Sequence, residues 1–407
     1  MYIKRALEKR ILTADKQFRA LIVTGPRQVG KTTLLKHLAE EGSRYREYIT
    51  LDDPVEREMA VREPVIFMAR HKPPVIIDEI QYAPNLLPYI KMYVDEHKNE
   101  GDFWLTGSQK FHLMKNVSES LAGRLAVIEM YGLSHSEIEG VESEPFVCDH
   151  TVMDERNKVR TPQGLTDVYE RIFRGSMPEA YLGNFNRKEF YSGYVNTYLQ
   201  RDIRDLTQVA DELDFLRFMT ACAARTSEMV NYADLAKDVG ISEPTAKHWL
   251  SLLVSSGIVA LVEPYFNNTL KRAIKTPKMY FMDTGLAVYL TRWDSPETLE
   301  VSAMSGKFFE TYVVSEILKS YYIKELRPPV YYYRDTDGKE IDLVLEYSGT
   351  VYPIEIKKTG NPGKDSIKNF DVLQNSGKLV GEGAVVCMYN KVHPIDLNNW
   401  TVPVWLI

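Results

Sequence analysis

The stretch Gly25-Pro26-Arg27-Gln28-Val29-Gly30-Lys31-Thr32 decides the fold of the N-terminal part of the chain. It matches the pattern G-x-x-x-x-G-K-[ST] and lies between an apolar run, Ala20 to Val23, and a helical start at Thr33. A loop between a strand and a helix presents backbone N–H groups to phosphate oxygens, and the positive end of the helix dipole assists. Lys31 would reach the β- and γ-phosphates, while the Thr32 hydroxyl would help to hold Mg²⁺. The stretch, together with Thr33, therefore predicts a site for ATP and Mg²⁺.

A second element of this site is predicted at Val75 to Glu79. Three apolar residues form a buried strand that ends in the acidic pair Asp78 and Glu79. Phosphoryl transfer needs a carboxylate that holds the metal and a group that polarises the attacking water. We therefore assign Asp78 to the Mg²⁺ shell and Glu79 to the water.

A third element follows the next strand, Phe103 to Leu105. This strand ends in Thr106-Gly107-Ser108. A hydroxyl at this position, such as that of Ser108, can sense the γ-phosphate. Small polar residues also commonly end strands without any such role, so both interpretations stay open.

The first 140 residues alternate strand-like runs with amphipathic helical stretches, as the runs at 48–51, 75–77 and 103–105 show. This rhythm is typical of a parallel sheet with helices on both faces, and it sets a first domain at 1–140. A second region, 141–210, is interpreted as a connector followed by a helical segment. Its first part, Val141 to Gly164, is polar and aperiodic, so it is expected to be a linker or an insertion.

Composition limits the class of protein. A chain of 407 residues predicts two or three domains. No window approaches ~18 consecutive apolar residues, and the N-terminus lacks the apolar stretch of a signal peptide, so we expect no membrane segment and a cytoplasmic location. Three widely spaced cysteines fit a reducing compartment. The net charge of −6 restricts any nucleic-acid contact to local patches.

The ATP-binding stretch resembles the AAA+ ATPases, especially the bacterial and archaeal branch whose phosphate loop reads GPRQVGKTT (AAA_14). That branch carries an LTGS strand and a later LAGR element, which appear here as Leu105 to Ser108 and Leu121 to Arg124. The resemblance implies that Arg124 is an arginine finger or second sensor acting across a subunit boundary, in a homo-oligomer such as a hexamer. A surface arginine without such a role is the alternative. Members of the family pair this ATPase with a C-terminal region called DUF4143, so the resemblance spans the chain.

Residues 211–290 are predicted to form a winged helix. Tyr232 to Val239 and the stretch after Ser242 read as two helices joined by a turn at Gly240, and two strands follow them. Helix, turn, helix and a basic hairpin is a layout that contacts DNA. Five basic residues are assigned to that contact: Lys247, Lys271, Arg272, Lys275 and Lys278. Winged helices also serve as packing modules, which leaves a non-binding alternative.

Residues 300–407 are predicted to form an α/β domain with a carboxylate cluster. Asp342 lies on one strand and Glu355 on the next, with Lys357 on the same face as Glu355, while a preceding helix carries Glu310. Clustered carboxylates beside a lysine suit metal-assisted phosphodiester hydrolysis, with Glu310, Asp342 and Glu355 as metal ligands. This resembles the PD-(D/E)xK nucleases, a restriction-endonuclease-like fold. Many relatives of that fold only bind, so catalysis, binding and ordinary hairpin charges all stay open.

Together these features predict a three-part α/β protein that binds and hydrolyses Mg-ATP and contacts DNA, with a nuclease-like C-terminal domain. The rival hypothesis is a nucleotide-driven switch or scaffold that binds an unknown protein partner and cuts nothing. The basic hairpin and the intact Asp342, Glu355 and Lys357 set favour the first hypothesis. The acidic net charge favours the second.

Overall fold

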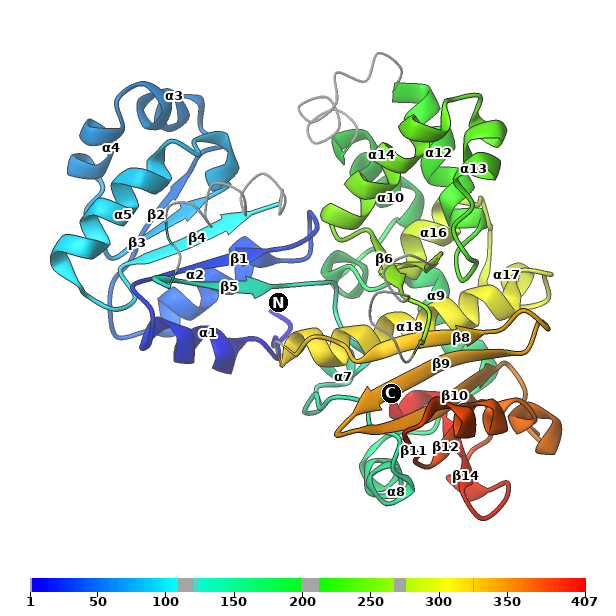
Figure 1. Cartoon of the computed structure of the whole chain (residues 1–407). Helices are drawn as coiled ribbons and strands as arrows, with labels where there is room; N and C mark the ends of the chain where they lie inside the picture. Colours follow the sequence, from blue (N-terminus) through cyan, green and yellow to red (C-terminus); the bar gives the residue numbers. More distant parts are fainter. Residues whose placement is uncertain (1, 109–120, 122, 199–211, 267–275, 325) are drawn as a thin grey trace.

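The structure is a computed structural model with three parts: an N-terminal α/β domain, a helical region and a C-terminal α/β domain (Figure 1). It describes residues 2–108, 121, 123–198, 212–266, 276–324 and 326–407. Among these described residues, no helix is both long and apolar enough to cross a membrane.

The N-terminal domain is built on a five-stranded parallel sheet in the order β2-β3-β4-β1-β5. Its strands are β1 (Ala20–Thr24), β2 (Glu47–Thr50), β3 (Val75–Asp78), β4 (Phe103–Gly107) and β5 (Leu125–Glu129). All five residues of β1 are buried, because it lies between β4 and β5 with helices on both faces. The predicted parallel sheet is confirmed, but the sequence analysis missed the edge strand β5.

Alternating residues of β1 send side chains to two separate cores. Leu21 and Val23 face a core that includes residues of α1 (Glu8–Asp15) and α2 (Lys31–Glu41). Ala20 and Ile22 face a core built with α3 (Pro54–Arg62), α4 (Pro64–Arg70) and α5 (Leu86–His97), and the short helix η1 (Ile80–Tyr82) follows β3. The carboxyl ends of all five strands meet at one edge of the sheet, where polar residues follow them.

The helical region carries a two-stranded antiparallel hairpin, β6 (Val259–Val262) and β7 (Lys278–Phe281). Three helices precede the hairpin in the predicted order: α12 (Glu212–Ala224), α13 (Tyr232–Val239) and α14 (Glu243–Ser255). The region also contains α9 (Leu165–Arg174), η2 (Pro178–Tyr181), α10 (Arg187–Tyr198), α16 (Thr284–Leu290) and α17 (Pro296–Glu300). Ser242 caps α14 by accepting a hydrogen bond from the backbone N–H of Thr245, as the sequence predicted.

The C-terminal domain begins with the long helix α18 (Ser305–Ile323), which packs on a mixed sheet in the order β13-β14-β12-β10-β9-β8 (Figure 1). Its strands are β8 (Val330–Arg334), β9 (Glu340–Tyr347), β10 (Thr350–Lys357), β11 (Leu379–Val380), β12 (Gly383–Cys387), β13 (His393–Pro394) and β14 (Asn399–Pro403), and β11 pairs with β10. Short 3₁₀ helices lie at η4 (Lys364–Ile367), η5 (Phe370–Ser376) and η6 (Val404–Leu406).

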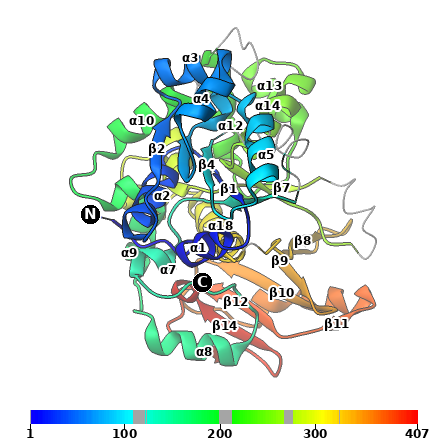
Figure 2. The ribbon, with the colours of Figure 1, turned by 90° about the vertical axis from the view of Figure 1, so that its left-hand side faces the viewer.

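The segment interpreted as a linker or an insertion, Val141 to Gly164, packs in large part against the C-terminal domain. After α7 (His135–Glu139), Phe146 is fully buried, and its backbone oxygen accepts a 2.6 Å hydrogen bond from the Tyr321 hydroxyl of α18. Helix α8 (His150–Val159) then lies beside β14, as two perpendicular views show (Figures 1 and 2). The polar sequence suggested a linker because its few apolar residues are isolated and their partners lie far along the chain.

Candidate functional sites

The phosphate loop, Gly25 to Thr32, follows β1 and enters α2. At Gly25 the backbone φ is +142°, and an added Cβ would lie 1.9 Å from the Met130 carbonyl oxygen, so only glycine fits there. Gly30 caps α2 with a φ of +93°. The side chain of Lys31 donates hydrogen bonds to the loop carbonyls of Gly25, at 3.0 Å, and Pro26, at 2.7 Å. The loop therefore curves around the Lys31 ammonium, and its N–H groups belong to the start of a helix.

Asp78, at the end of β3, accepts hydrogen bonds from three hydroxyl groups. Thr32 donates to Oδ1 at 2.7 Å, Tyr48 donates to Oδ2 at 2.9 Å, and Thr106 also donates to Oδ1. Thr32 and Asp78, which the sequence analysis assigned separately to the Mg²⁺ shell, are thus in direct contact. Tyr48 was not predicted, because it lies in the middle of β2 and no motif marks it.

Glu79, the next residue, lies between β3 and the short helix η1. Its φ of +59° is left-handed, and its backbone N–H donates to the Thr106 hydroxyl at 3.0 Å. The side-chain amide of Gln81 donates both to the Glu79 carboxylate and, at 3.1 Å, to the Ser108 hydroxyl. Gln81 therefore links Ser108 to Glu79 through hydrogen bonds. The sequence analysis did not identify Gln81.

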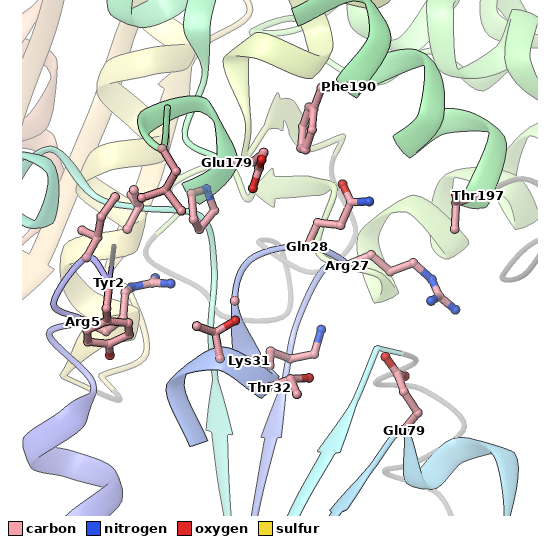
Figure 3. A pocket seen from close by; sticks show the side chains of 16 residues that line it. Tyr2, Arg5, Arg27, Gln28, Lys31, Thr32, Glu79, Glu179, Phe190 and Thr197 are labelled. Carbon is pink, nitrogen blue, oxygen red and sulfur yellow. The ribbon is translucent and has the colours of Figure 1, made fainter. Parts of the chain in front are cut away.

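A cavity of about 640 Å³ lies over the phosphate loop. Figure 3 shows Lys31, Thr32 and Glu79 at its floor, Phe190 and Glu179 on the opposite side, and the N-terminal segment at one end. Its lining includes the predicted loop residues Arg27, Gln28, Gly30, Lys31, Thr32 and Thr33, together with Tyr2, Ile3, Leu133, Pro178 and Leu182. Polar groups at one end and apolar side chains at the other suit a ligand with a charged phosphate chain and a flat base.

The back of the phosphate loop is held by Arg5, which sequence reasoning also missed. The guanidinium is buried, donates to the Val29 carbonyl at 2.8 Å and forms an ion pair with Glu137 at 2.9 Å. On the other side, Pro26 lies against the turn between α14 and β6, where an added Cβ on Gly257 would approach Pro26 to 3.1 Å. The loop is thus packed between the N-terminal segment and the helical region.

Arg124 lies immediately before β5, at the edge of the sheet opposite the phosphate loop. Its guanidinium contacts Asp95 of α5, and about a third of the side chain is exposed. This contact lowers the pKa of Asp95. Because the loop follows the opposite end of neighbouring β1, Arg124 cannot serve the nucleotide of its own chain in this arrangement.

The residues assigned to DNA contact fall into three groups. Lys247 is exposed on the outer face of α14, opposite the buried Trp249. Lys271, Arg272 and Lys275 lie outside the described residues, so their assignment stays a prediction. Lys278 requires a correction. Its side chain is 4% exposed, and its ammonium is 2.5 Å from Glu340 and 3.4 Å from Glu310, so it faces the C-terminal domain and not a nucleic acid.

The carboxylate cluster of the C-terminal domain is present in outline. Strands β9 and β10 are antiparallel neighbours, and the Asp342 carboxylate accepts a 2.8 Å hydrogen bond from the Ile356 N–H. The Lys357 ammonium is 2.6 Å from Glu355 and 3.9 Å from Asp342. As predicted, Ile356 is buried between Glu355 and Lys357, which share the other face. Burial, with Asp342 nearby, raises the pKa of Glu355 to about 7.

Glu310 joins this cluster from α18 but is bound by the hairpin of the helical region. It accepts hydrogen bonds from the Tyr280 hydroxyl at 2.7 Å and from Lys278. Burial raises the pKa of Glu310 to about 7, against the effect of Lys278. Burial alone would lower the pKa of Lys278, but Glu310, Asp342 and Glu340 outweigh it, so its pKa is raised and the ammonium stays charged.

The fit of a divalent ion to this cluster can be tested on the geometry. Within the described part of the chain, the set of three His, Cys, Asp or Glu residues whose ligand atoms all lie within 4.8 Å of one another is Asp149, His150 and Glu382. The trio Glu310, Asp342 and Glu355 does not meet this condition. The closeness of Asp149, His150 and Glu382 follows from their packing roles and needs no metal, since Asp149 caps α8 and His150 stacks on Trp400. Glu310, Asp342 and Glu355 therefore do not all lie within ligand range of one another here, and their role as metal ligands stays a prediction.

With this geometry in place, comparisons with known proteins define the class of the N-terminal domain. Residues 17–139 match the family model described as "AAA domain", which, with the phosphate loop and Asp78, supports an AAA-like P-loop ATPase domain. Residues 165–297 match "Domain of unknown function (DUF8612)", and residues 305–407 match "Domain of unknown function (DUF4143)".

Among individual proteins, the chain is similar to an uncharacterized protein of Mycobacterium tuberculosis and one of Mycobacterium bovis. Each is 27% identical over 362 residues, which cover 88% of this chain and 75% of the relative. Solved structures with a loose likeness include a Walker-type ATPase of Pyrococcus abyssi, at 15% identity and a TM-score of 0.44, covering 72% of this chain and 96% of that one. The RuvB Holliday junction branch migration motor of Thermotoga maritima matches at 16% identity and a TM-score of 0.31, covering 63% and 89%. At these TM-scores nothing about this chain follows from the likeness.

Proposed function

We propose that the chain binds Mg-ATP in the cavity over the phosphate loop and hydrolyses it. The observation that carries this proposal is the 2.7 Å hydrogen bond of Asp78 with Thr32, next in the chain to Lys31, whose ammonium contacts the loop carbonyls. A hydroxyl and a carboxylate are hard oxygen donors of the kind that Mg²⁺ prefers, and they meet where the loop would place phosphate oxygens. The residues present therefore fit Mg-ATP.

Each residue has a distinct part in this reaction. Lys31 would exchange its loop carbonyls for phosphate oxygens, and Thr32 and Asp78 would hold Mg²⁺, which would neutralise charge on the phosphates. Glu79 faces the cavity and orients the attacking water, while Gln81 fixes the Glu79 carboxylate relative to Ser108. The apolar end of the cavity excludes water from the base.

Two substitutions test this proposal. Lys31→Ala should lower ATP affinity by about a hundredfold or more, because the ammonium contacts phosphates in the ground state. Glu79→Gln should keep the affinity and lower turnover by roughly 10²–10⁴-fold, because Glu79 acts on the water. Isothermal titration and a phosphate-release assay measure the two effects. Lys9→Ala, which removes an exposed lysine of α1, is the matched control. Unchanged ATP affinity in Lys31→Ala would refute the site.

We also propose that the active form is a homo-oligomer, such as a hexamer. The support is the position of Arg124 at the edge of the sheet away from its own phosphate loop. A residue there can complete a nucleotide site only on a neighbouring subunit. Its present partner, Asp95, is on the same domain and would be exchanged for a phosphate of that neighbour.

Contact with DNA is proposed for α14 and the segment after β6. The polar face of α14, with Lys247, His248 and Ser251 exposed, lies opposite a buried apolar face, as in a helix that approaches a DNA groove. Lys271, Arg272 and Lys275 lie outside the described residues, so their contact with DNA stays a prediction from the sequence. Lys278 is excluded from the proposed DNA-contact surface, because its side chain is buried.

The C-terminal domain is proposed to have a PD-(D/E)xK-like fold, supported by Asp342 and Glu355 on neighbouring strands and Lys357 beside them. The second candidate function, a nucleotide-driven switch without cleavage, is favoured by one observation: the carboxylates are already paired with lysines. Cleavage assays on linear, single-stranded and branched DNA with Mg²⁺ or Mn²⁺, with and without ATP, separate the two functions.

A further inference from the structure

Lys278 is the most deeply buried cation of the carboxylate cluster, and it comes from outside the C-terminal domain. It begins strand β7 of the hairpin, and its side chain is 4% exposed. Its ammonium lies 2.5 Å from Glu340 of β9 and 3.4 Å from Glu310 of α18. One ammonium thus bridges two elements that would otherwise present facing negative charges.

The hairpin that carries Lys278 is docked on the C-terminal sheet by its backbone. The N–H of Tyr332 in β8 donates to the Glu263 carbonyl at 3.1 Å, and the N–H of Tyr265 donates to the Tyr332 carbonyl at 2.6 Å. The Tyr332 hydroxyl donates to the Thr276 carbonyl at 2.5 Å. The chain just after β6 and just before β7 is therefore attached to β8, which fixes where Lys278 enters the cluster.

The carboxylates of the cluster also have other partners, each through one of its two oxygen atoms. Glu310 accepts a hydrogen bond from Tyr280, Asp342 accepts one from the Ile356 N–H, and Glu355 is paired with Lys357. A divalent ion entering here would meet a buried ammonium of the same sign in a medium that screens charge poorly. It would also find no set of three carboxylates in ligand range.

We propose that Lys278 takes the place of a divalent cation in this cluster, so that the C-terminal domain binds no such ion while β7 is docked. The hairpin then closes the nuclease-like site, and metal binding requires Lys278 to leave. This inference does not rest on the ATPase, because its ligands and its site lie entirely outside the phosphate loop.

The test is Mn²⁺ binding by the 407-residue chain without nucleotide, measured by isothermal titration. The wild type and Glu355→Gln should give the same isotherm, because the cluster of the wild type is closed. Lys278→Met should bind one more Mn²⁺ per chain than the wild type, since a like charge has gone from the cluster. Adding Glu355→Gln to Lys278→Met should abolish the new site.

Lys307→Met is the matched control, because Lys307 is a lysine of α18 that pairs with Glu228. It should gain no site. A wild-type Mn²⁺ site that disappears in Glu355→Gln would overturn the proposal, and this comparison holds even if Lys278→Met fails to fold. Folded Lys278→Met protein that gains no Glu355-dependent site would overturn it as well.

Discussion

Tyr48→Phe tests how the Mg²⁺ carboxylate is held. The substitution removes the hydroxyl that donates to Asp78 Oδ2 at 2.9 Å and keeps the aromatic ring. The ring is needed, because the Lys36 ammonium lies 3.5 Å from its centroid. Burial, followed by the charge of Asp78, raises the pKa of Tyr48, so the hydroxyl keeps its proton and donates at neutral pH.

The size of the effect follows from the geometry. A hydrogen bond to a charged group contributes roughly 1.5–3 kcal/mol. Tyr48 is only half-buried, so water can replace part of this contribution, and we take about 1.4 kcal/mol, which corresponds to about a tenfold change in an equilibrium constant. Thr32 and Thr106 still hold the other Asp78 oxygen. The loss should therefore fall on metal affinity and not on the water attack.

The assay is ATP hydrolysis at saturating ATP with increasing Mg²⁺. Tyr48→Phe should need about tenfold more Mg²⁺ for half-maximal rate, while the maximal rate changes by less than about twofold. Tyr45→Phe, at a side chain that is 85% exposed nearby on the chain, is the control and should behave as the wild type. An unchanged Mg²⁺ requirement in Tyr48→Phe would show that the hydroxyl does not position Asp78.

Two further predictions concern assembly and DNA. Arg124→Ala subunits mixed with Lys31→Ala subunits should recover part of the ATPase activity, because some interfaces then join an intact loop to an intact arginine; a protein that stays monomeric with ATP by light scattering would contradict this. Changing Lys271, Arg272 and Lys275 together to Glu should weaken binding to all DNA sequences alike. The slope of log affinity against log salt concentration should become shallower by an amount equal to the loss of up to about three phosphate contacts, as fluorescence anisotropy at several salt concentrations would show. Lys237→Glu on α13 is its control, and wild-type affinity in the triple variant would place the DNA surface elsewhere.

The sequence predicted the positions of the phosphate loop, Asp78 and Glu79 because their signals are local in the chain. The loop, Asp78 and Glu79 each lie at the end of a strand whose apolar run is visible without a structure. The sequence analysis did not identify Tyr48 and Gln81, because no motif in the adjacent sequence indicates a role for them. Their roles arise only when β2, β3 and β4 lie side by side.

The strand β5 and the burial of Lys278 show two other limits. A short apolar run such as Leu125–Glu129 does not by itself distinguish a strand from other buried structure. Lys278 has basic residues before it in the sequence, which suggested a solvent-facing wing, yet its acidic partners lie 32 residues away at Glu310 and further along at Glu340. An ion pair between two domains produces no periodic pattern in the sequence, so the sequence could not predict the burial of Lys278.

The packing of Phe146 against α18 has a consequence for how the chain folds. Its hydrogen bond to Tyr321 closes a loop of 175 residues, and that of Cys148 to the Glu382 carbonyl closes one of 234. During synthesis this segment leaves the ribosome long before α18 and β12 are made. Phe146 therefore cannot pack against its partners until those elements have been synthesised. A fragment that starts at residue 300 lacks this segment and exposes the surface that it covers. The C-terminal domain is therefore a discontinuous folding unit, completed from both halves of the chain only when synthesis is nearly finished.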